Sequence, residues 1–144
     1  MSETPDHGSR GHAEFSPSSL KYVAGCAGYE STSGTNAAAE KGTRIHEALE
    51  VRDPSALHDE EELEIYDKIV KAEDEFNKSI FKDGGFEEMN EIQVHVDLGD
   101  TSTWGTCDRF LVNGNKAIMA DYKTGVSPID SPRDNWQAKA YTLG

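Results

Sequence analysis

The sequence predicts a protein of the α/β (α+β) class, because two periodicities follow one another along its 144 residues. Residues 37–81 repeat apolar side chains every three or four positions, which is typical of helices with one buried face. Residues 92–123 alternate apolar and polar side chains, which is typical of half-buried strands. Asn113-Gly114, the strongest short-range hairpin signal, lies between two of these predicted strands.

The length suits one domain, which we expect over residues 16–144 after a polar segment, residues 1–15, that is predicted to be disordered. No apolar run approaches the roughly 20 residues that a membrane-spanning helix needs, and the first residues lack the hydrophobic stretch of a secretory signal. Cys26 and Cys107 belong to no CxxC pair, so neither a disulfide framework nor a structural zinc site is expected. These features favour a soluble cytoplasmic protein with free thiols.

The formal charge of -13 argues against simple phosphate binding, but the acidity is concentrated in one part of the chain. Residues 51–100 carry 16 acidic and 5 basic side chains, whereas residues 101–144 carry 4 acidic and 5 basic ones. A nucleic-acid site in the last third is therefore compatible with the net charge. An alternative function is that of an acidic interaction protein, in which the sequence motifs described below would have arisen by chance.

The first predicted helix is short and begins at Ser16-Pro17, where serine would cap the helix and proline would occupy its first position. Its buried face would consist of Leu20, Val23 and Ala24. A second helix is predicted over Ala37–Val51, with Ile45, Ala48 and Leu49 on one face.

Gly42 lies inside this second helix, where glycine costs about 1 kcal/mol relative to alanine unless close packing compensates. His46 follows one turn later and therefore lies on the same stripe.

The third predicted helix, from Asp59 to about Phe81, has the clearest amphipathic spacing. Its acidic start, 59–62, is either a metal or partner site or a solvated helix start favoured by the helix dipole. The predicted apolar face comprises Leu63, Tyr66, Ile69, Val70, Phe76 and Ile80.

Three strands are predicted next, and a helix follows them. The first strand contains Ile92, Val94 and Val96 and points His95 toward solvent; Gly99-Asp100 forms a turn. The second and third strands are expected over residues 103–112 and 115–123, followed by a loop over 125–132. The helix begins near Asp134 and carries Trp136, Gln137, Ala140 and Tyr141.

Two carboxylates converge if Asn113-Gly114 is a two-residue hairpin loop. Asp108 then faces Met119, and Asp121 is the diagonal neighbour of Asp108, at roughly 7–8 Å between Cα atoms. Because residues two apart share one side of a strand, Lys123 lies on the same face. A loop with an odd number of residues would reverse one strand and separate the carboxylates.

Two buried carboxylates repel unless a proton or a cation lies between them. Hard oxygen ligands select Mg²⁺, Ca²⁺ or Mn²⁺, and Lys123 beside such an ion could polarise a water or neutralise charge on a phosphate. Metal-assisted attack of water on a phosphodiester is the chemistry that this arrangement suits. The alternative for Asp121-x-Lys123 is an ordinary ion pair on an edge strand.

Five short segments together resemble the PD-(D/E)XK nucleases of the RecB-like, phage and prophage type. They are GHAEFSPSSLKYVAGC (11–26), KGTRIHEALE (41–50), GTCD (105–108) with DYKTG (121–125), and QAKAY (137–141), in the family's order. The resemblance implies a restriction-endonuclease-like core, with a central mixed sheet flanked by helices in the order α-β-β-β-α. The final strand of that core would be missing, so the domain over 16–144 is expected to be truncated at its C-terminus.

The same resemblance assigns roles to individual residues. His46, Asp108 and Asp121 would ligate Mg²⁺ or Mn²⁺ together with the backbone carbonyl of Tyr122, and Lys123 would be the catalytic lysine. Gln137 and Tyr141 match the QxxxY motif, which would orient the site or contact DNA, and their i,i+4 spacing puts both on one helical face. Core packing remains the alternative role for His46 and for this pair.

The implied activity is a metal-dependent DNA exonuclease in phage DNA recombination or processing, working beside a single-strand annealing protein in the host cytoplasm. No iron–sulfur cluster is expected, because Cys26 lacks the three later cysteines that related clusters need. An exposed sheet edge would favour a homo-oligomer. The runner-up function is a truncated, catalytically inactive module that binds DNA or a partner.

Overall fold

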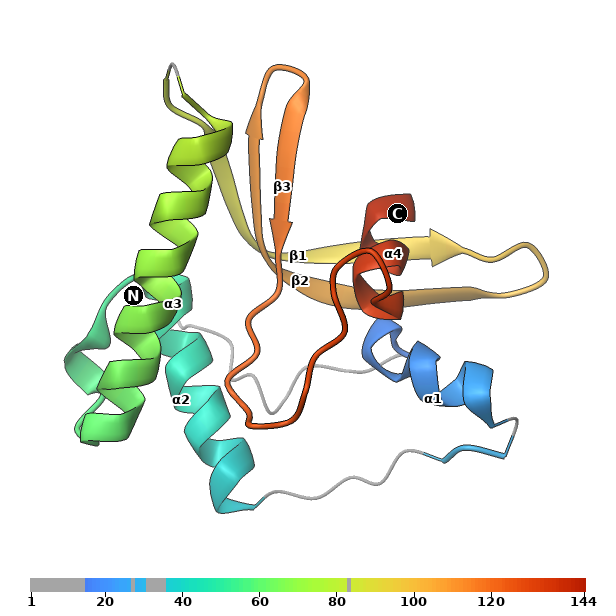
Figure 1. The fold of residues 1–144 in the computed structure, drawn as a ribbon. Helices are drawn as coiled ribbons and strands as arrows, with labels where there is room; N and C mark the ends of the chain where they lie inside the picture. The colour runs from blue at the N-terminus through green and yellow to red at the C-terminus, as the bar shows by residue number, and fades with distance from the viewer. Residues whose placement is uncertain (1–14, 27, 31–35, 83) are drawn as a thin grey trace, which may run out of the picture. The chain divides into compact units, whose positions relative to one another are not determined.

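The computed structural model describes residues 15–26, 28–30, 36–82 and 84–144, so the predicted disorder of residues 1–15 lies almost wholly outside the described part. The described chain is a mixed α+β structure in which three main helices precede a three-stranded sheet and a fourth follows it (Figure 1). The helices are α1 (Leu20–Gly25), α2 (Ala37–Val51), α3 (Glu60–Ile80) and α4 (Trp136–Leu143), and the strands are β1 (Glu87–Asp97), β2 (Ser102–Asn113) and β3 (Lys116–Ala120).

The chain divides into two compact units that interleave along the sequence. One unit comprises residues 1–32, 93–105 and 130–144, and the other comprises 33–92 and 106–129. None of the described helices combines the length and the apolar character needed to cross a membrane.

Helices α2 and α3 confirm the two longest helical predictions and carry most of one hydrophobic core. Asn36 caps α2 by accepting from the Ala39 N–H, and Asp59 caps α3 by accepting from the N–H groups of Glu61 and Glu62. The core comprises Ile45, Ala48, Leu49, Leu57, Tyr66 and Tyr122, bordered by Leu63, Ile65, Ile69 and Val70.

The predicted apolar face of α3 is wrong toward its C-terminal end. Phe76 is 54% exposed, whereas Asn77 is buried and the Glu73 side chain is only 8% exposed. Polar partners for Glu73 on other segments explain this exchange, and they are described below. At the other end, Glu62 is buried against Arg44 of α2, so the acidic helix start is only partly solvated.

The first predicted helix is a 3₁₀ turn over Pro17–Ser19 followed by α1. Pro17 is its buried residue, whereas Leu20 and Val23 are half-buried and Ala24 is exposed, which corrects the predicted apolar face. Ser16 is the N-cap residue and Pro17 occupies the first position of the turn, as predicted, although the Ser16 side chain makes no hydrogen bond to a backbone N–H of the turn.

The sheet has the strand order β1-β2-β3, and β2 pairs antiparallel with β3. The predicted register is wrong by two: Asn113 pairs with Lys116, and Phe110 rather than Asp108 faces Met119. In this register the two loop residues are Gly114 and Asn115. Only Gly114, the first of them, has a positive φ, at 60°, which is typical of a type II′ turn. Because the error is an even number, the predicted sharing of one face is preserved.

Strand β3 ends at Ala120, three residues earlier than predicted. The next N–H group that could extend the strand, that of Tyr122, donates to the Asp108 carboxylate, and the Tyr122 carbonyl contacts the His46 ring. Side chains therefore occupy the backbone groups that another strand pair would use.

Candidate functional site

His46 lies on α2 and points its imidazole toward the end of β3. Its Nδ1 is 2.8 Å from the carbonyl oxygen of Gly42, one helical turn earlier, and its Nε2 is 2.9 Å from the carbonyl oxygen of Tyr122. A Cβ at Gly42 would lie 3.1 Å from the Thr124 Oγ1, so the close packing expected at this glycine is present. His46 is therefore aimed at the segment that follows β3, and its side chain is 25% exposed.

Asp108, on β2, meets the same segment. Its Oδ2 accepts the Tyr122 N–H at 2.5 Å and lies 3.7 Å from the His46 Nε2. Burial and, after it, the negative charge of Asp121 raise the pKa of Asp108 to about 6, although the Tyr122 N–H and His46 act in the opposite direction. Asp121 is thus close enough for its charge to oppose the ionisation of Asp108.

Asp121 and Lys123 form an ion pair through the Asp121 Oδ2 and the Lys123 Nζ. Their side chains are 23% and 39% exposed, so the pair lies at the border of solvent. The ion-pair alternative for this Asp-x-Lys sequence describes the arrangement in this structure. Asp121 nevertheless stays near enough to Asp108 for its charge to act on that carboxylate.

Glu91 also acts on this cluster, and the sequence argument left it outside the candidate set. Its negative charge contributes to the raised pKa of Asp108. Glu91 adopts a φ of 53° within β1, a conformation that costs a non-glycine residue about 1–3 kcal/mol and that often occurs at functional sites. Its sequence signal is its place at the start of the first predicted strand, just before the alternating run that begins at Ile92, where the resembled family often carries a glutamate.

Gln137 and Tyr141 share one face of α4, as their spacing predicts, and the Gln137 Nε2 donates to the Tyr141 Oη at 3.3 Å. Tyr141 is buried, and a Cβ at Gly105 would lie 2.9 Å from its hydroxyl oxygen and 2.9 Å from the Pro17 Cδ. These residues belong to the unit that contains residues 93–105 and 130–144, whereas His46 and Asp108 belong to the other unit. Their role at a metal site stays a prediction.

The predicted metal ligands are brought together only in part. Among the residues that the structure describes, no three His, Cys, Asp or Glu side chains form a group that could hold a metal ion. The chemistry of the donors still fits a hard cation. If Nδ1–H of His46 donates to Gly42, the lone pair of Nε2 faces the Tyr122 carbonyl and the Asp108 carboxylate, and such atoms need a proton or a cation between them.

Cys107 and Cys26 are both free thiols, as expected, and they differ in environment. Cys107 is buried beside Asp108, and burial raises the pKa of its thiol to about 11. Its Sγ donates weakly to the carbonyl oxygens of Arg109 and Ala120, so it is a packing group rather than a nucleophile.

No protein-family model, curated protein or solved structure matches this chain.

Proposed function

We propose that the chain is a metal-dependent DNA nuclease with a RecB-like, restriction-endonuclease-like core. One observation carries this proposal: the His46 Nε2, the Asp108 carboxylate and the Tyr122 carbonyl converge where Asp121 and Lys123 follow the last strand. In the described residues the order α3-β1-β2-β3-α4 has the α-β-β-β-α pattern of that core, with α1 and α2 preceding it, and this supports the same fold. A purely structural ion pair would not require a half-buried histidine and a second carboxylate beside it.

His46, Asp108, Asp121 and the Tyr122 carbonyl would hold Mg²⁺ or Mn²⁺, and Glu91 is close enough to add its charge. The ion would supply Lewis-acid polarisation of a phosphate and a water of lowered pKa. Asp108 would remain ionised beside the cation, because an opposite charge offsets the repulsion that raises its pKa.

Lys123 would serve the chemical step. In this structure its ammonium is paired with Asp121. When Asp121 instead ligates a cation, the ammonium can contact a phosphate oxygen or orient the attacking water, at the point where negative charge develops. The unequal exposure of the two side chains, with Lys123 nearer to solvent, suits this role.

The test is incubation of the purified chain with linear and covalently closed circular DNA, with Mg²⁺ or Mn²⁺ and with chelator. We expect metal-dependent loss of the linear DNA only, as for an exonuclease, and no cleavage by Asp108→Asn. Metal-dependent nicking of the circle would indicate an endonuclease instead. Binding of DNA without cleavage at any metal concentration would contradict the proposal and favour the inactive binding module.

A further inference from the structure

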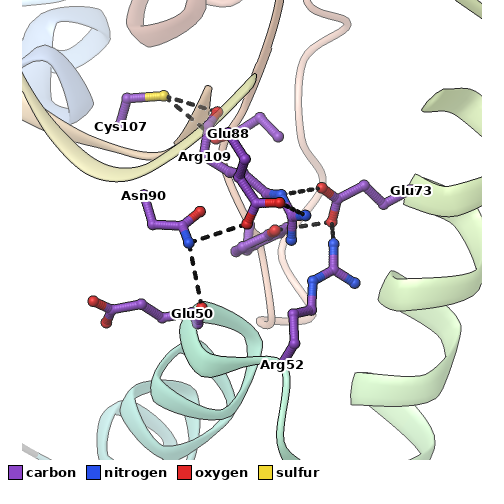
Figure 2. Close-up of polar contacts among 9 residues, drawn as sticks. Glu50, Arg52, Glu73, Glu88, Asn90, Cys107 and Arg109 are labelled. Carbon is purple, nitrogen blue, oxygen red and sulfur yellow. Dashed lines mark hydrogen bonds and ion pairs between the residues drawn. The ribbon is translucent and has the colours of Figure 1, made fainter. Parts of the chain in front are cut away.

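A buried network of charges contacts the side chain of Tyr122. Glu73 of α3 is its centre: the Arg52 Nη2 donates to the Glu73 Oε2 at 2.6 Å, and the Arg109 Nε lies 3.0 Å from the Oε1 (Figure 2). The Tyr122 hydroxyl donates to the same Oε2 at 2.8 Å. The side chains of Glu73 and Arg109 are only 8% and 7% exposed.

A buried ionic network of this kind contributes little net stability to a fold. Removing charges from water often costs more than their attraction returns, and well-packed apolar residues are frequently as stable. Glu88 extends the network on β1, where its Oε2 accepts from the Arg109 Nη2 at 2.6 Å. The network therefore joins α3, β1, β2 and Arg52, the C-cap residue of α2, around a single tyrosine, which suggests that it holds that tyrosine in place.

Tyr122 is fixed at three points. Its N–H donates to Asp108, its carbonyl contacts His46 and its hydroxyl donates to Glu73. Two of the three anchors belong to the candidate site, and the third belongs to the network.

We infer that Glu73, held by Arg52 and Arg109, is a positioning residue for the segment 121–123. This segment follows the end of β3 at Ala120, so strand pairing does not hold it. Fixing the ring and the peptide of Tyr122 fixes the directions in which the neighbouring Asp121 and Lys123 leave the backbone. Misplacement by about 1 Å can lower a rate about 10²-fold. The inference rests on the proposed function.

The test compares Tyr122→Phe and Glu73→Gln with a matched control, Glu62→Gln. Glu62 is also on α3 and is also bonded to an arginine of α2, Arg44, but it lies in the first turn of the helix. Its side chain is 4% exposed, close to the 8% of Glu73. The measurements are kcat and KM for DNA cleavage, urea unfolding, and hydrogen exchange of the residue 122 amide without metal.

Tyr122→Phe and Glu73→Gln should lower kcat about 10- to 100-fold, leave KM within about threefold, and accelerate exchange at amide 122. Glu62→Gln should lose comparable stability and leave kcat and that amide unchanged. An equal loss of kcat in all three variants would show a general effect of lost stability and would overturn the inference. Unchanged kcat and unchanged exchange of amide 122 in Tyr122→Phe would also overturn it. If the parent neither binds metal nor cuts DNA, the proposed function fails, and amide exchange still decides the positioning role.

Discussion

Asp108→Asn should stabilise the chain when no divalent metal is present. The asparagine Oδ1 can still accept the Tyr122 N–H, which the Asp108 Oδ2 accepts at 2.5 Å. The substitution removes a negative charge that burial and Asp121 both oppose. A residue proposed to be essential for activity is thus expected to weaken the fold.

The magnitude follows from the pKa of Asp108, which is raised from an ordinary 3.8 to about 6. Each pKa unit corresponds to about 1.4 kcal/mol, so ionisation of the folded protein opposes folding by about 3 kcal/mol at most. The folded chain binds this proton more tightly than the unfolded chain. The stability that the protonated Asp108 carboxyl gives is therefore present below about pH 4 and is lost as the pH rises to about 6. Asparagine should recover about 1–3 kcal/mol above pH 6, or about 2–9 °C in Tm.

The assay is thermal and urea unfolding in chelator at pH 4.5, 6 and 7.5. Asp74→Asn is the control, because Asp74 is an exposed carboxylate of α3 and the change removes the same charge. The gain in the Asp108 variant should be small at pH 4.5 and largest at pH 7.5. A saturating metal should then reverse the order, since a ligand at 100 times its Kd stabilises only the parent by about 2.7 kcal/mol.

A loss of stability in Asp108→Asn at pH 7.5 without metal would refute this reasoning, because it would show that the carboxylate supports the fold. A gain that is equal at all pH values, or equal to that of Asp74→Asn, would assign the effect to net charge alone. Either result would remove the electrostatic argument for a cation at this position.

Three further predictions concern other parts of the chain. Lys123→Met should slow DNA cleavage about 10²–10³-fold while the metal-induced rise in Tm is retained, and cleavage within a fewfold of the parent would make Lys123 a structural partner only. Gly105→Ala should lower the free energy of unfolding in urea by about 1–3 kcal/mol, because its Cβ would lie 2.9 Å from the Tyr141 hydroxyl; an unchanged free energy would show that this packing can adapt. With a thiol reagent at pH 8, Cys26 should react at least about 100-fold faster than Cys107, whose pKa is about 11, and the difference should vanish in urea.

Local periodicity was sufficient to predict α2, α3 and the three strands, because each buries one face that the spacing of its own residues defines. The hairpin register was not predictable from Asn113-Gly114, since glycine can take the first or the second loop position. The buried charges were missed for a different reason. Burial of Glu73 depends on Arg52 and Arg109, which lie 21 and 36 residues away in the chain, and no local pattern contains such a pairing.

The prediction that the candidate carboxylates share one face of the sheet holds despite the register error, because the register differs by an even number of residues. The predicted pairing set Asp108 opposite Met119, whereas the observed pairing sets Phe110 there, and a shift of two leaves every side chain on its original face. The same alternation explains how one tripeptide serves both the core and the site. Asp121 and Lys123 meet each other, while Tyr122 turns its ring to Glu73 in the interior. Inserting one residue between the hairpin and Asp121 would exchange these directions, placing a carboxylate in the core and the tyrosine ring at the site.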